Sequence, residues 1–236
     1  MTQVLKLFVA LVGAVSVVSA FAQPSAADAD VRPTPASDYS NVKLYERWEA
    51  DSTPGTVASQ CKGRAYGEIV TGFGEWSDVI RIATNDAVGG CVLQLAVVDP
   101  DGVMKGWNLQ TELKANGDAG QCHNTGMHSI PIVKTVEQAR TSGLTLGLDT
   151  DDRPGGCLVT FFVKSPGPQL AVYFAQEGSL GPNDDGCWMT GKKIARQGEP
   201  ASIGINADNN RSPCLLQFSL FSPERGLKPV EGLAIK

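Results

Sequence analysis

Apolar and polar residues alternate along several stretches of this chain, and the same alternation occurs three times. Two apolar residues, two positions apart, precede a cysteine in each copy: Ile80 and Ile82, Leu146 and Leu148, Ile203 and Ile205. Three more follow each cysteine at the same spacing: Leu93, Leu95 and Val97, then Val159, Phe161 and Val163, then Leu216, Phe218 and Leu220. A spacing of two is the period of a β-strand with one buried face. The pattern predicts antiparallel strands on both sides of each cysteine.

The cysteines at the centre of this pattern belong to a longer repeated phrase. Each follows a turn-like stretch rich in glycine, proline, asparagine and aspartate, and a proline lies nine residues after each of them: Pro100, Pro166 and Pro223. A repeat of fixed spacing indicates a repeated supersecondary unit. We place the three units at about residues 57–118, 119–183 and 184–236.

We expect about four strands in each unit, and therefore an all-β fold. β-prone stretches at 107–113 and 170–174 close the first two units, whereas the third offers only residues 232–235. A short helical pattern at 134–140 lies in a connection. Three such units suggest a closed threefold arrangement of the β-trefoil or β-prism kind. The alternatives are a β-sandwich or a row of small sheets.

The N-terminus has the composition of a secretory signal. Lys6 precedes an apolar run at 7–18, and Ala20-Phe21-Ala22 is typical of a cleavage site. We expect residues 1–22 to be a signal peptide and residues 23–41, rich in Pro, Ala, Ser and Asp, to be a disordered leader. Residues 42–236 would then form the β-region of an extracellular protein.

All six cysteines of the sequence lie after the predicted signal, and an even number in an exported chain indicates disulfides. The repeat selects one of the fifteen pairings that six cysteines allow. Each pair would join corresponding places in one unit: Cys61 with Cys91, Cys122 with Cys157, and Cys187 with Cys214. No close-set pair of cysteines of the kind that binds zinc occurs in the sequence.

Charge and hydropathy exclude two classes of partner. The net charge is −5 and the basic residues are scattered, which disfavours nucleic acid. After the predicted signal no apolar stretch is long enough to span a bilayer.

Oxygen-bearing side chains gather in the repeated turns, where they are candidate ligand-binding residues: Asp86, Asp151, Asp152, Asp208 and Asn209. Such groups can coordinate Ca²⁺, but the spacing matches no calcium loop, and tight turns select the same residue types. We favour the turn interpretation, with no cofactor. Asn210-Arg211-Ser212 is a glycosylation sequon, although Pro213 directly after it disfavours its use.

Tryptophan placement supplies a further candidate. Trp107, between Gly106 and Asn108, is the tryptophan that we expect to be exposed and to bind a ligand through its ring. Trp188 follows Cys187 directly, so we interpret it as core packing against a disulfide.

Catalytic patterns are weak in this sequence. The histidines are His123 and His128, and no serine nucleophile motif accompanies them. We interpret His123 as a surface residue and assign no catalytic residue. A carboxylate pair of the glycosidase type remains open, because separation in space defines such a pair.

These patterns favour a secreted, non-catalytic binding protein whose most plausible ligand is a glycan. One alternative is a secreted effector or protease-inhibitor-like protein that acts on an extracellular protein partner, since rigid disulfide-bridged scaffolds present loops well. Another is a hydrolase with an unrecognised carboxylate site.

Overall fold

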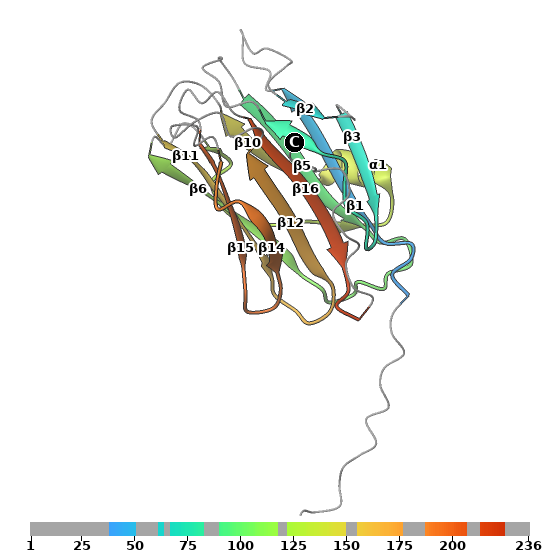
Figure 1. Ribbon diagram of the computed structural model, residues 1–236. Coiled ribbons are helices and arrows are strands. Elements are labelled where there is room, and N and C mark those ends of the chain that lie inside the picture. The colour runs from blue at the N-terminus through green and yellow to red at the C-terminus, as the bar shows by residue number, and fades with distance from the viewer. Residues whose placement is uncertain are drawn as a thin grey trace, which may run out of the picture. The chain divides into compact units, whose positions relative to one another are not determined.

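The computed structural model describes residues 38–50, 61–63, 67–82, 90–117, 122–149, 155–176, 187–206 and 213–224. These residues form sixteen strands and one short helix, which confirms the all-β prediction (Figure 1). The predicted signal at 1–22 and most of the predicted leader at 23–41 lie outside the described residues. The last four residues of that leader, 38–41, are described, and Asn41 hydrogen-bonds Asp101 at 2.8 Å.

The strands form three sheets, which we call A, B and C. Sheet A has the order β3 (Gly67–Gly72), β1 (Lys43–Ala50), β5 (Gly90–Val98), β10 (Leu144–Asp149), β7 (Cys122–His123), and β9 (Ile132–Val133) pairs with β5 in parallel. Sheet B has the order β14 (Gly191–Ala195), β12 (Gln169–Gln176), β16 (Cys214–Phe221), β4 (Ile80–Ile82), β2 (Cys61–Gly63). Sheet C has the order β13 (Cys187–Trp188), β15 (Ala201–Asn206), β11 (Gly155–Val163), β6 (Leu109–Gly117), β8 (Gly126–Ser129).

Each sheet is therefore assembled from segments that are far apart in the sequence. The long strand that contains the second cysteine of each unit is central: β5, β11 or β16. The N-terminal strand β1 lies between β3 and β5, and the last described strand, β16, pairs with β4 from the first unit. Early and late parts of the chain thus depend on one another for their backbone hydrogen bonds.

The core contains the side chains that the alternation identified. All fifteen residues of the three predicted patterns are buried, and one hydrophobic cluster includes side chains from all three sheets. Phe161 of β11 and Phe218 of β16 meet edge to face there, with ring centroids 5.6 Å apart. Side chains two residues apart in a strand point to the same face, so the observed strand register places this whole set of apolar side chains on the buried face.

The three disulfides are the ones predicted from the repeat, and each joins two different sheets. Cys61–Cys91 links sheet B to sheet A, Cys122–Cys157 links A to C, and Cys187–Cys214 links C to B. Their Cα atoms are 5.6, 5.7 and 5.6 Å apart, within the usual range for a disulfide. On the chain-entropy model each loop of this length contributes about 3 to 4 kcal/mol.

The first unit contains five described strands and the second contains six, where four were expected, and the third contains four. In the second and third units the stretch that follows the first cysteine forms two strands, because the chain turns sharply between them. Asn124, after β7, and Met189, after β13, have positive φ angles of 61° and 63°. The expected strand at 232–235 lies outside the described residues.

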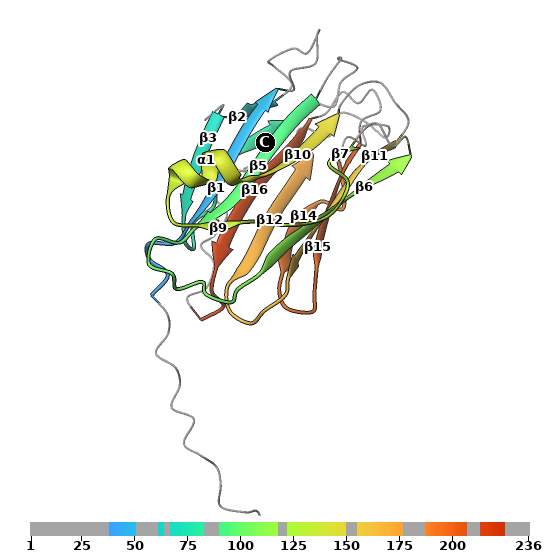
Figure 2. The ribbon, with the colours of Figure 1, turned by 180° about the vertical axis from the view of Figure 1, so that it is seen from behind.

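The short helix α1 (Val136–Ser142) covers part of sheet A. Thr135 caps it by accepting a hydrogen bond from the Gln138 amide at 3.2 Å. Ala139 is buried against Tyr45 and Ala96, on the face of sheet A that points away from the core. Figure 2 shows α1 in front of β1 and β5. The expected helix at 134–140 is thus observed two residues later. The described residues include no helix with the length and apolar character that a bilayer crossing requires.

Candidate functional site

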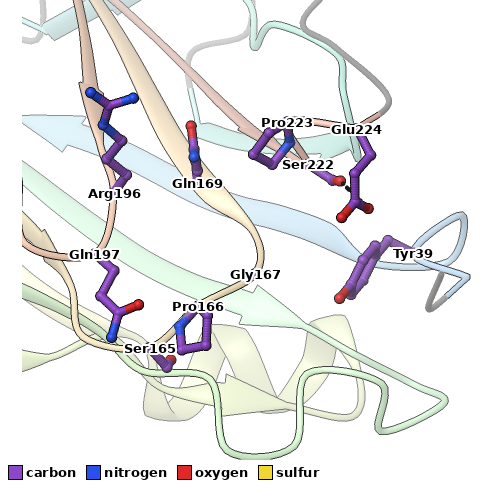
Figure 3. A pocket seen from close by; sticks show the side chains of 10 residues that line it. All are labelled: Tyr39, Ser165, Pro166, Gly167, Gln169, Arg196, Gln197, Ser222, Pro223 and Glu224. Atoms are coloured by element: carbon purple, nitrogen blue, oxygen red, sulfur yellow. Dashed lines mark hydrogen bonds between the residues drawn. The ribbon is translucent and has the colours of Figure 1, made fainter. Parts of the chain in front are cut away.

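A pocket of about 310 Å³ lies where several strands end, and we call it the strand-end pocket. Its volume is near the lower end of the range for small-ligand sites, about 300–1,000 Å³. Segments from the end of β11, the start of β12, the end of β14, the end of β16 and the residues before β1 line it: Tyr39, Ser165, Pro166, Gly167, Gln169, Arg196, Gln197, Ser222, Pro223 and Glu224. Figure 3 shows Tyr39 and Glu224 on one side of the pocket and Arg196 and Gln197 on the opposite side.

Two amide side chains of this pocket are unpaired within the described residues. Gln169 begins β12, and Gln197 lies in the turn between β14 and β15. Within the described part of the chain neither side chain has a hydrogen-bond partner. An amide carries both donors and an acceptor, so it can pair with a hydroxyl group in either direction.

The charged groups of the pocket are compensated locally. The Arg196 guanidinium contacts the Glu199 carboxylate at 2.6 Å, and the backbones of these two residues exchange two hydrogen bonds of 2.9 Å. Glu224, on the other side, accepts a hydrogen bond from Ser222 at 3.2 Å. Arg196 is thus paired with a residue that does not line the pocket, and Glu224 is the carboxylate that does. These charges do not select a strongly anionic ligand.

An aromatic ring borders the same pocket. Tyr39 stacks on Phe73, with centroids 4.9 Å apart and planes 20° apart. This contact holds the ring in place before any ligand arrives, which lowers the ordering cost of binding. Because Tyr39 lies in the range predicted to be a disordered leader, the sequence alone did not identify it.

Trp107 is buried, so the expectation that it is exposed was wrong. It is 7% exposed, and its indole N–H donates to the Pro168 carbonyl at 2.9 Å. That bond joins the loop before β6 to the loop before β12. Trp107 lines a second hollow of about 370 Å³ together with Asp99, Met104, Lys105 and Lys134. The Asp99 carboxylate accepts three backbone N–H groups, so it organises the loop.

Trp188 lies on the outer face of sheet C, where it is half-buried, and not in the core as interpreted from its neighbouring cysteine. It pairs with Gly204 across β13 and β15. Successive strand residues point to opposite faces, so Cys187 turns inward and Trp188 outward.

The acidic turns that the sequence offers as candidate binding sites belong to stretches that the structure does not describe. Asp86, Asp151, Asp152, Asp208, Asn209 and the sequon residue Asn210 all lie outside the described residues. Among the residues that the structure does describe, no group of three or more His, Cys, Asp or Glu side chains is placed to hold a metal ion.

The two histidines are part of local structure near the start of the second unit. His123 is exposed, as predicted, and its side chain packs over Gly147. The His128 Nε2 donates to the Asn124 carbonyl oxygen at 2.8 Å. Neither residue lines the strand-end pocket.

One buried acid stands apart from both hollows. Glu46 of β1 is completely buried, and its carboxyl oxygens have no hydrogen-bond partner within the described residues. Burial raises the pKa of Glu46 to about 8, an effect that the nearby Trp48 and Ser77 side chains partly offset. At neutral pH this carboxyl is therefore mostly protonated.

The strand-end pocket was not predicted from the sequence, although one sequence signal leads to it. Two of the three repeated prolines, Pro166 and Pro223, line the pocket, and each follows the end of a central strand. The repeated prolines therefore indicate at which end of the sheets the pocket lies. The amides and Tyr39 come from other segments, and only the fold brings them there.

Comparison with known proteins gives no relative: no family model, curated protein or solved structure matches this chain. The function must therefore be argued from the residues of this chain.

Proposed function

We propose that this chain is an exported, non-catalytic protein that binds a carbohydrate in the strand-end pocket. The observation that carries the proposal is the pocket itself, with its unpaired Gln169 and Gln197 amides opposite the fixed ring of Tyr39. Sugar hydroxyls both donate and accept hydrogen bonds, and a sugar ring also has an apolar face. A pocket of about 310 Å³ suits one or two rings.

Export is supported by the three disulfides, because such bonds persist in oxidising compartments outside the cytosol. The signal-like residues 1–22 support it independently. Mass spectrometry of the protein recovered from culture medium should find Gln23 as the first residue. A chain that stays in the cell with Met1 in place would contradict the export proposal.

We also propose that the three units close into a threefold arrangement. The common strand order supports this: β1, β6 and β12 flank the central strands on one side, and β10, β15 and β4 flank them on the other. In this arrangement β1, from the N-terminus, completes the third unit. An experimental structure in which the three sheets are not related by one axis would contradict it.

The test of the pocket is calorimetric titration of the full mature chain with soluble mono- and disaccharides chosen from a glycan array. For a sugar that binds, the double variant Gln169→Ala and Gln197→Ala should weaken affinity about tenfold or more, since two hydrogen bonds are lost. Gln176→Ala is the matched control, because Gln176 lies at the other end of β12, away from the pocket. It should bind like the wild type.

Two results would overturn this proposal. One is the absence of binding to any sugar on a broad array. The other is unchanged affinity in the double variant. Release of shortened sugars during a long incubation would contradict the non-catalytic part alone and would favour a hydrolase.

A further inference from the structure

Trp188 of β13 lies directly against the neighbouring strand of sheet C, β15. A Cβ atom added to Gly204 would be 2.0 Å from Cε2 of Trp188 and 2.3 Å from Cδ2 and Nε1. Real Cβ atoms do not come that close, so the indole ring rests directly on the backbone of β15. Gly204 is required there for space, since any side chain would displace the ring.

The residues around this ring alternate between apolar and hydrogen-bonding groups. Across β11, Leu158 lies opposite Gly204 and Thr160 lies opposite Ser202. The hydroxyls of Thr160 and Ser202 are 2.9 Å apart. Further along β11, the Lys164 ammonium lies 4.9 Å above the Phe162 ring. Glu112 of β6 lies opposite Thr160 on the other side of β11. We call Trp188, Leu158, Thr160, Ser202, Phe162 and Glu112 the sheet C platform.

Several side chains of this face are partly accessible in the described structure, whereas Thr160 is buried and only 8% exposed. Trp188, Leu158 and Phe162 are half-buried, and Met127 on the edge strand β8 is 45% exposed. The corresponding face of sheet A is covered by α1, under which Tyr45 and Ala96 are fully buried. The contrast shows that sheet C lacks an equivalent cover among the described residues.

Charge on this face favours a neutral ligand. Glu112 is paired with Lys114 at 2.9 Å, and the Lys164 ammonium is engaged by the Phe162 ring. An ordered ring beside hydroxyls, on a face whose described charges are one ion pair and one lysine over an aromatic ring, suits the apolar face and the hydroxyl groups of a sugar ring. Five strands at about 4.8 Å spacing give about 19 Å of surface, room for several consecutive rings.

We infer that the sheet C platform binds a neutral polysaccharide chain that lies flat across the strands, with one sugar ring stacked on Trp188. This inference shares the carbohydrate class of the proposed function but uses a surface other than the strand-end pocket. The pocket takes the end of a chain or a small sugar, whereas the platform takes an extended polymer.

The test measures how much of the full mature chain is retained on insoluble cellulose, chitin and β-1,3-glucan. On the polymer that retains the wild type, Trp188→Ala should weaken binding about tenfold, and Trp188→Phe should weaken it less. Gly204→Ala should match Trp188→Ala, because it displaces the ring without removing it. Met189→Ala is the control, since Met189 is the exposed neighbour of Trp188 and lies outside the platform.

Soluble sugars separate this inference from the proposed function. Trp188→Ala should keep the wild-type affinity for a small sugar, which the Gln169 and Gln197 variants lose. If Trp188→Ala and Trp188→Phe bind the polymer like the wild type, or if no polymer retains the wild type, the platform inference is wrong while the pocket proposal stands. Thermal melts identify any variant that fails to fold. Should Gly204→Ala unfold, the two Trp188 variants decide the question.

Discussion

The outer faces of sheets A and C are built on the same kind of strand framework but have different surfaces. In both sheets an outward ring lies over a glycine of the neighbouring strand: His123 over Gly147 in sheet A, and Trp188 over Gly204 in sheet C. In sheet A the connection at 130–143 is long enough to place α1 on the sheet, whereas the connection at 196–200 before β15 is a tight hairpin. The lengths of these two connections thus determine which of the two faces a described helix covers.

The contacts beneath α1 show how that cover is held. Gln94 of β5 donates to the Arg140 carbonyl at 3.1 Å, and Arg140 contacts the Glu68 carboxylate of β3. Ala139 supplies the buried apolar contact. Sheet C has no such contacts from a helix among its described residues, where Trp188, Leu158 and Phe162 are half-buried and Thr160 is buried.

The largest expected effect is on the pH dependence of stability, and it comes from the inner faces of the sheets. Glu46 of sheet A and Thr111 of sheet C hold corresponding places there, opposite Leu95 and Phe161. Because the pKa of Glu46 is raised to about 8, the folded state binds a proton that the unfolded state releases between about pH 4.5 and 8. Stability should therefore fall as pH rises through that window, by up to about 5 kcal/mol. Urea unfolding from pH 4 to pH 9 measures it.

Glu46→Gln should flatten this pH profile, and Thr111→Val, the control at the corresponding place, should leave its shape unchanged. A wild-type stability that is constant from pH 5 to pH 8 would show that Glu46 is not held as a neutral acid.

A smaller effect is expected from the helix that covers sheet A. Ala139→Leu forces extra volume against Tyr45 and Ala96, and overpacking of this kind costs about 1–3 kcal/mol. Urea unfolding at pH 6 measures the loss. Polymer binding should not change, because sheet C is remote from α1. If the variant lost as much binding free energy for the polymer as free energy of unfolding, the two faces would not be independent.

The smallest effect is expected from the ion pair at the end of that helix. The hydrogen bond from Arg140 is the main reason that the pKa of Glu68 lies below its usual value. Arg140→Ala should raise the Glu68 pKa toward the ordinary range, as NMR titration of the carboxyl would show. Because Arg140 is exposed, the change in the free energy of unfolding should be too small to resolve. An unchanged Glu68 pKa would contradict this assignment.

Much of the fold could be predicted because its signals are local. The alternation around Leu93, Phe161 and Phe218 identified buried strand faces, and the repeated cysteines identified the disulfide pairs. The split after each first cysteine was missed, because a positive φ at Asn124 or Met189 leaves no clear pattern in the sequence.

The site was harder to predict because it depends on which segments meet. Trp107 and Trp188 were assigned the wrong environments because only strand pairing places Gly204 beneath Trp188 and Pro168 beside Trp107. The strand-end pocket draws Tyr39, Gln169 and Gln197 from separate parts of the chain. No spacing rule joins such residues before the sheets are known.

The most direct test of carbohydrate binding is an NMR titration of the uniformly ¹⁵N-labelled mature chain with a soluble oligosaccharide of the polymer that it binds. We expect shifts in the side-chain amide resonances of Gln169 and Gln197 and in the indole N–H resonance of Trp188, while the resonance of the buried Trp48 indole stays constant. Saturable binding that moves none of these three groups would contradict both the pocket and the platform.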